Sequence, residues 1–445
     1  MRGVLDKLIS PSQNVFVPGC SIGDNILLAQ ELFHSYNQYH LPPRCALKVD
    51  LQKAYDTVEW DFLSAVITLF GFPAQFILWI EECVTTPSFS ICLNGRVQLI
   101  KSVLTALQVY WAMAFILPKI VIREIEKRLR SFLWKGCAGV GYAKVSWQQV
   151  CRPVTEGGLG IRDILALNKG LMSRHLWRVI IADRSSIWVD WIIHYRLHGT
   201  SIWTVSDHSG SWGWRKLVRL RALSSSDSPW GPRHSSTSAT APLSTVIRDG
   251  GSFSSAAAYD VFHPPGPKVD WSSLLVGSLK IPRHRFILWL AILGRLSTLD
   301  KPWLQHLGTD CVLCRAATPE THSHLFFSCP FASECLHEIR AAVIFHWPYS
   351  SWETAIRWAS ARWHGKHVVN TSYRALLASL VYYLWEERNR RIFQQTAWTP
   401  VDIARTIVFE IRDLIISKQM DSSVSTRGLY RLWRIPWPVE GDAHA

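Results

Sequence analysis

Four metal-binding side chains lie close together between residues 311 and 329 and constrain the fold more than any other feature of the chain. Cys311 and Cys314 are separated by two residues, and His324 and Cys329, ten residues further on, are separated by four. Three thiolates and one imidazole form a standard closed ligand set for structural zinc. The spacing therefore predicts a small zinc-stapled module. A closed set leaves no position for water, which argues against a catalytic metal.

A second motif occupies residues 46–63, with the sequence ALKVDLQKAYDTVEWDFL. A short apolar run ends at Asp50, and a Lys-Ala-Tyr-Asp turn contains Tyr55. This resembles the first catalytic motif of reverse transcriptases from plant non-LTR, LINE-type retrotransposons. The resemblance implies that Asp50 is a ligand of catalytic magnesium at the end of a palm strand. It also implies that Tyr55 screens against the ribose 2′-hydroxyl of an incoming nucleotide. Taken alone, Asp50 could equally cap a helix or lie in a surface turn.

The segments around this motif extend the resemblance. Residues 10–32 are similar to the fingers segment of the same enzymes, although Cys20 stands where the family has an arginine. An arginine could pair with a triphosphate in a bidentate manner, and cysteine cannot. Directly after Asn94 and Gly95, the sequence resembles the helical region that, in the same enzymes, follows the hairpin with the second catalytic motif. The chain contains no two adjacent aspartates, so the second metal-binding motif of the family is absent. Two-metal phosphoryl transfer needs both ions in place, and we therefore expect the chain to be inactive as a polymerase.

The zinc cluster has its own resemblance. Residues 281–330 are similar to the C-terminal zinc-binding domain of plant LINE-type reverse transcriptases, a pattern that Trp289, Asp300 and Glu320 also fit. His322 is a rival ligand, but the pattern favours His324, which directly precedes Leu-Phe-Phe. Cys335 is left as a spare thiol.

Composition bears on partners and compartment. The chain has 48 Lys and Arg against 34 Asp and Glu, a net charge of +14. This balance suits a polyanion such as RNA or DNA, bound without sequence preference, although a solvated basic surface explains it too. Ten cysteines without framework spacing indicate a reducing, intracellular environment, and the resemblance implies the nucleus. No apolar stretch is long enough for a signal peptide or a membrane span, so we expect no membrane partner. Nothing in the sequence sets an oligomeric state.

Two helical segments each allow more than one interpretation. Val121, Ile125, Leu129 and Leu133 recur every four residues opposite a basic face, which suits either a thumb-like helix along a nucleic acid or an ordinary amphipathic helix. Residues 371–394 predict a helix ending in three arginines. These arginines suit the helix dipole better than they suggest RNA binding.

The expected fold class is α+β, mainly α. Its parts are a truncated reverse-transcriptase fingers and palm remnant, a helical thumb-like region, a small zinc-binding module and a helical C-terminal region. The expected boundaries are 1–95, 96–203, a Ser/Gly/Pro-rich linker at 204–250, 251–340 and 341–445. The expected function is that of a polymerase-inactive, nucleic-acid-binding fragment with structural zinc. The alternatives are an active RNA-directed DNA polymerase whose missing palm is supplied elsewhere, and a domesticated interaction protein that uses the zinc module.

Overall fold

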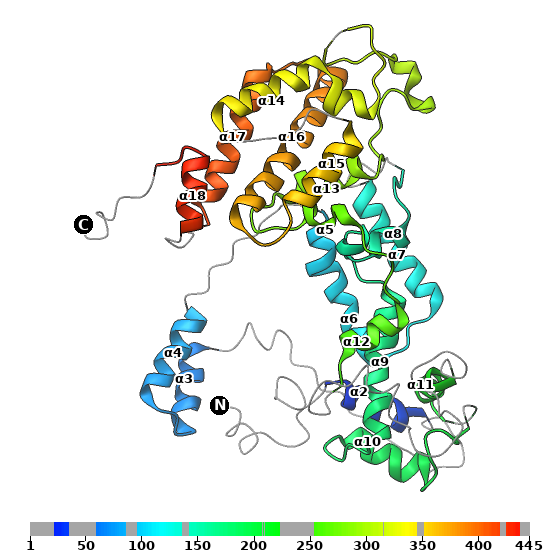
Figure 1. Cartoon of the computed structure of the whole chain (residues 1–445). Helices are drawn as coiled ribbons and strands as arrows, with labels where there is room; N and C mark the ends of the chain where they lie inside the picture. Colours follow the sequence, from blue (N-terminus) through cyan, green and yellow to red (C-terminus); the bar gives the residue numbers. More distant parts are fainter. Residues whose placement is uncertain are drawn as a thin grey trace. The chain divides into compact units, whose positions relative to one another are not determined.

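The chain forms two structural units, which are described separately (Figure 1). One unit comprises Ala29–Asn94, and the other comprises Met1–Leu28 together with Gly95–Ala445. The computed structural model describes residues 22–34, 59–85, 96–135, 142–206, 208, 210–222, 253–314, 316–344, 351–418 and 424–436.

The described residues are mainly helical, as the sequence predicted. Their β-structure consists of single-residue bridges, among them an antiparallel bridge between Asp310 and Pro319. The palm strand expected before Asp50 lies outside the described residues, so the fingers and palm remnant stays a prediction.

The smaller unit contains a helical hairpin. Helix α3 (Trp60–Leu69) and helix α4 (Ala74–Thr85) are joined through Gly71, which has a positive φ of 76°. The Ser64 hydroxyl donates a hydrogen bond of 2.7 Å to the Glu81 carboxylate across the hairpin. Helix α3 has no buried residue, so this hairpin has little core of its own.

In the larger unit, one core forms where α9 (Ile164–Ile180), α10 (Ile187–Ile192) and α11 (Trp212–Ala222) meet Leu27 of α2 (Ile22–His34). Its largest side chains belong to Trp188, Trp214 and Met172. Helix α11 falls inside the segment predicted as a linker. The prediction failed here because Trp214, Leu217 and Val218 recur at helical spacing within a polar stretch and are fully buried.

Helices α6 (Thr105–Ala114) and α7 (Lys119–Trp134) lie beside α9. The buried Asn168 amide donates to the carbonyls of Ala112 and Phe115 and accepts from the Leu117 amide. These bonds satisfy carbonyls that the end of α6 leaves without helical partners. Before α7 and after it lie four shorter helical segments: α5 (Arg96–Leu99), the π-helix η1 (Ile100–Leu104), α8 (Trp147–Cys151) and the 3-10 helix η3 (Val154–Glu156).

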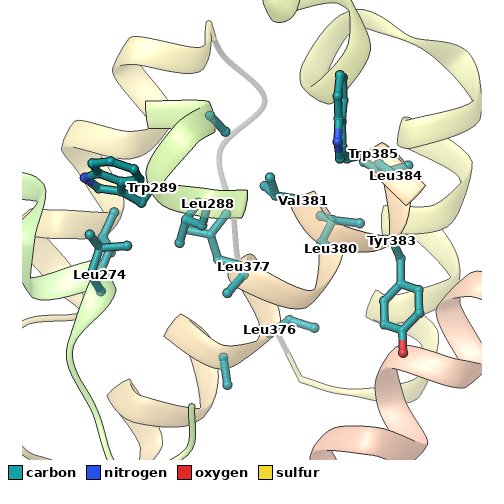
Figure 2. Close-up of a cluster of buried hydrophobic side chains, with 14 of the residues drawn as sticks. Leu274, Leu288, Trp289, Leu376, Leu377, Leu380, Val381, Tyr383, Leu384 and Trp385 are labelled. Carbon is teal, nitrogen blue, oxygen red and sulfur yellow. The ribbon is translucent and has the colours of Figure 1, made fainter. Parts of the chain in front are cut away.

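The larger core surrounds α16 (Val368–Phe393) (Figure 2). Apolar side chains line almost every face of this 26-residue helix, as expected for a helix that is buried all round. Its neighbours include α13, whose Leu288 and Trp289 are fully buried. The other helical segments of this part are α12 (Ser255–Phe262), η5 (Asp270–Leu275), α13 (Pro282–Ile292), η6 (Pro302–Leu307), η7 (His324–Ser328), α14 (Pro330–Ala342), α15 (Trp352–Arg362), α17 (Pro400–Ile416) and α18 (Val424–Leu432).

This core crosses the boundaries expected from the sequence, because residues of the thumb-like region, the zinc-binding region and the C-terminal region all contribute to it. The Trp289 indole donates a hydrogen bond of 2.9 Å to the Gly157 carbonyl. A Cβ on Gly158 would lie 2.0 Å from the Arg152 carbonyl oxygen, so only glycine fits this close approach. These three regions therefore pack as one body.

Candidate metal centre

The four predicted ligands converge in the structure. The donor atoms of Cys311, Cys314, His324 and Cys329 all lie within 4.8 Å of one another. The Cys311 and Cys329 sulfurs are 3.9 Å apart, and the Cys314 sulfur is 3.4 Å from His324 Nε2. A tetrahedral zinc ion with Zn–S bonds of about 2.3 Å holds its sulfurs roughly 3.8 Å apart. The donor set and its spacing therefore fit zinc.

Short backbone contacts shape the loop that carries these ligands. The bridge at Asp310 is extended by a bond of 2.9 Å from the Cys311 amide to the Thr318 carbonyl. His324 opens η7, a single π-helical turn of the kind often found at functional sites. Cys329 then precedes α14, with Pro330 at its first position, where a missing amide proton is tolerated.

Burial and proximity set the protonation of the thiols. Cys311 and Cys329 are both buried. Their contact lowers the pKa of the Cys311 thiol, because Cys329 donates a hydrogen bond to it. The same contact, together with burial, raises the pKa of the Cys329 thiol. Two adjacent thiolates repel each other, so a cation is needed to hold the three sulfurs in their ionised, metal-binding form.

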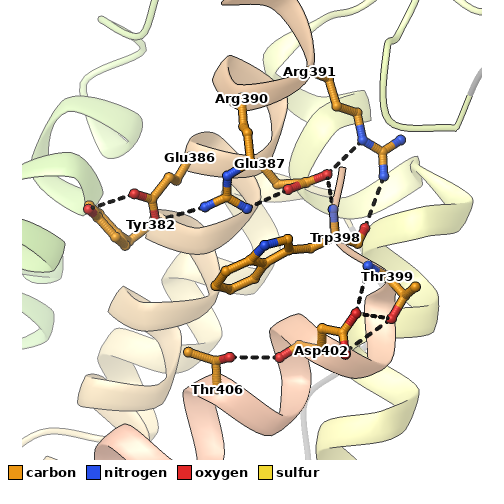
Figure 3. A network of polar contacts seen from close by, with 9 residues as sticks. All are labelled: Tyr382, Glu386, Glu387, Arg390, Arg391, Trp398, Thr399, Asp402 and Thr406. Atoms are coloured by element: carbon orange, nitrogen blue, oxygen red, sulfur yellow. Dashed lines mark hydrogen bonds and ion pairs between the residues drawn. The ribbon is translucent and has the colours of Figure 1, made fainter. Parts of the chain in front are cut away.

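Helix α16 supports the knuckle from outside the loop. Arg391 Nη1 donates to the carbonyls of Val312, at 3.1 Å, and Leu313, at 2.7 Å. Glu387 in turn accepts from Arg391 Nε at 2.8 Å, from Arg390 and from the Trp398 amide (Figure 3). The backbone between the first two cysteines is thereby tied to the end of a buried helix.

A buried ion pair holds the loop at a second point. Glu320 is fully buried and receives three hydrogen bonds of 2.8 to 3.2 Å from the Arg388 guanidinium. Its Oε1 also accepts from the Leu299 amide at 3.0 Å. The sequence pattern identified Glu320 but not its partner. The helix-dipole interpretation missed the ion pair of Arg388, because 68 residues separate it from Glu320. The pairs of Arg390 and Arg391 with Glu387 lie at helical spacing and could have been read from the sequence.

The two rival residues have other environments. The His322 ring packs edge-on against Trp352, with ring centroids 4.6 Å apart, and burial lowers its pKa. Cys335 lies in the core, and burial raises the pKa of its thiol to about 12. Neither residue belongs to the cluster.

The polymerase candidates are placed differently. Asp50, Tyr55 and Cys20 lie outside the described residues. Asp24, from the fingers-like segment, is buried, lies 2.6 Å from Arg178 and accepts a bond of 2.6 Å from the Ser186 hydroxyl. This geometry gives Asp24 a structural role.

Comparison with known proteins agrees with both sequence motifs. Residues 1–143 match the reverse transcriptase (RNA-dependent DNA polymerase) family, and residues 253–335 match the family described as zinc-binding in reverse transcriptase. The chain is related to the reverse transcriptases of plant retrotransposons. It contains both a reverse-transcriptase domain and a zinc-binding domain of that family.

Three curated relatives match parts of the chain. A putative ribonuclease H protein of Arabidopsis thaliana is 31% identical over 31% of the chain and 23% of its own length. An uncharacterized transposon protein of Xenopus laevis is 29% identical over 20% of the chain and 7% of its own length. An uncharacterized mitochondrial protein of Arabidopsis thaliana is 26% identical over 26% of the chain and 78% of its own length. The chain thus spans less than a quarter of the first two relatives. No solved structure matches it.

Proposed function

We propose that this protein is a nucleic-acid-binding fragment of a plant LINE-type reverse transcriptase, stapled by structural zinc and inactive as a polymerase. The observation that carries the proposal is the convergence of Cys311, Cys314, His324 and Cys329 inside the zinc-binding family segment. Four protein donors complete a tetrahedral shell, so the ion would stabilise the loop and leave no position for a reacting water.

Nucleic-acid binding is supported by charge. Lys119, Arg123, Lys127 and Arg130 are exposed along α7. The opposite side of this helix buries Ile122, Leu129 and Leu133. Lys127 and Arg130 pair with Glu124 and Glu126 at this exposed surface. Cations on this face would contact phosphates, which carry no base information, so binding should tolerate any sequence.

The proposed inactivity rests on the missing aspartate pair, because Asp50 alone cannot place two ions. Magnesium would therefore not be productively bound. The proposed domain boundaries are 1–95, 96–203, a linker at 204–250 that contains α11, 251–340 and 341–445. We also propose a reducing compartment, the nucleus, in which the zinc thiolates stay intact. The described part of the chain contains no helix of the length and apolarity needed to cross a membrane.

The direct test uses the full-length protein. Metal analysis after extensive dialysis should find about one zinc per chain, with X-ray absorption reporting three sulfurs and one nitrogen. Fluorescence anisotropy with a labelled oligonucleotide should show binding that weakens steeply between 50 and 200 mM salt. A zinc-free folded protein, or no oligonucleotide binding at low salt, would refute the corresponding part of the proposal.

A further inference from the structure

A cavity of about 710 Å³ opens where the segment before α8 faces the loop between α13 and η6. Its volume lies in the range of ligand-binding pockets, about 300–1,000 Å³. Small and apolar side chains form part of the wall. Its three cationic and two aromatic side chains are Lys144, Arg295, Lys301, Tyr142 and Trp303.

These side chains are unusually available for a ligand. Tyr142 is 93% exposed and Trp303 is 67% exposed, so neither ring is used to build a core. Among the described residues, Lys301 has an ion-pair partner, Asp300, at 3.5 Å. Lys144 and Arg295 have no ion-pair partner among the residues that the structure describes.

Lys144 contributes a partly buried cation to the wall of this cavity. Its side chain is partly buried, and this burial, followed by repulsion from Arg388, lowers its pKa. A desolvated cation without a counter-charge destabilises a fold, and a bound phosphate would remove that penalty.

We propose that this cavity binds a short stretch of single-stranded nucleic acid, with backbone phosphates on Lys144 and Arg295 and a base stacked on Trp303. The inference deepens the proposed function by naming the site and the form of the nucleic acid. Exposed aromatic rings stack on bases only when those bases are unpaired, and sites of this kind combine such rings with basic grooves. Tyr142 offers a second ring at the same opening.

The cavity is coupled to the metal centre through Glu320. The Leu299 amide donates to the Glu320 carboxylate, and the Asp300 amide donates to the Glu320 carbonyl at 3.2 Å. Glu320 lies between Cys314 and His324, so the loop that carries Arg295 and leads into Trp303 of η6 is fixed by the zinc-bearing segment. Zinc would therefore hold one wall of the cavity in place.

The test measures anisotropy of labelled 12-nucleotide oligo(dT), oligo(U) and a duplex of equal length on the full-length protein. The cavity variants are Arg295→Glu and Trp303→Ala. Their matched controls are Arg357→Glu, an exposed arginine of α15, and Trp111→Ala, an exposed tryptophan of α6. Circular dichroism verifies that all variants remain folded.

We expect each cavity variant to weaken single-strand binding roughly fivefold or more, while both controls stay within twofold of wild type. Single strands should bind more tightly than the duplex, and the two oligonucleotides report whether RNA or DNA is favoured. If wild type binds but the cavity variants match their controls, or if the duplex binds as well as single strands, the cavity inference is wrong and the proposed function stands. If wild type binds nothing at low salt, the proposed function itself fails.

Discussion

The zinc-binding region and the segment that matches reverse transcriptases differ in how completely their predicted metal ligands are present in this chain. Around the zinc cluster, the ligands and Glu320 are buried or half-buried and are supported by α16, which lies outside the matched zinc-binding segment. In the segment that matches reverse transcriptases, the sequence offers Asp50 but contains no pair of adjacent aspartates. We therefore expect substitutions at the zinc ligands to change stability and a substitution at Asp50 to leave it unchanged. The predictions below test this difference.

The largest effect is expected from Cys314→Ser. Structural zinc contributes on the order of 10 kcal/mol in small zinc-dependent domains, and a missing thiolate opens the shell. Zinc content should fall from about one per chain to nearly zero, and the thermal midpoint should drop.

Cys335→Ser is the matched control, because it removes a buried thiol that is outside the cluster. It should retain zinc. A Cys314→Ser protein with full zinc content would break the contrast between the two regions.

Glu320→Gln should lower the free energy of unfolding by about 3–5 kcal/mol, because it leaves the Arg388 guanidinium buried without its carboxylate. Urea unfolding measures this value. Arg128→Gln, which breaks the exposed pair with Glu124, should change it by less than about 0.5 kcal/mol. Equal effects of the two substitutions would show that Glu320 does not anchor the loop.

Asp24→Asn should cost roughly 1–3 kcal/mol, because the buried Arg178 loses one charged hydrogen bond but keeps Asp183 as a partner. Thermal and urea unfolding detect this loss. Asp190→Asn, at an exposed pair with Arg184, is the control and should be nearly neutral. If Asp24→Asn is also neutral, the Asp24–Arg178 ion pair does not stabilise the larger unit.

Acidification should destabilise the protein through His284. This ring is buried against Tyr382 and Ser379, with Glu410 Oε2 3.7 Å from its Nδ1, and burial followed by repulsion from Arg283 lowers its pKa from 6.5 to about 3. Between these values the unfolded chain binds a proton that the folded chain does not, so stability falls as pH decreases.

Comparing wild type with His284→Gln isolates this contribution. The wild type should lose about 1 kcal/mol more than the variant between pH 7 and pH 5.5. Identical pH profiles would contradict a neutral, buried His284.

Local spacing allowed much of the zinc site to be predicted. The four ligands lie within 19 residues of sequence, and their chemistry excludes most other arrangements. The helices at α7 and α16 also followed from apolar periodicity.

The partners of Glu320 and of Gly157 could not be predicted, because Arg388 and Trp289 reach them across 68 and 132 residues. No pattern among neighbouring residues in the sequence indicates which distant residue will be the partner. The linker prediction failed over α11 for a related reason, since a polar composition concealed side chains that tertiary packing buries. The cavity likewise arises from two segments about 150 residues apart in sequence.

The smallest effect is expected from Asp50→Asn, which should change none of the measured properties. The protein should extend no primer on an RNA template with magnesium or manganese, because two-metal transfer needs carboxylates from a second motif that the sequence lacks. Asp50→Asn should leave zinc content, oligonucleotide binding and thermal midpoint unchanged. The essential comparison is with Asp24→Asn, the same substitution at a buried position of the same region. If Asp50→Asn abolishes a template-dependent incorporation that wild type supports, the reverse-transcriptase region has kept its chemistry, and the difference between the two regions disappears.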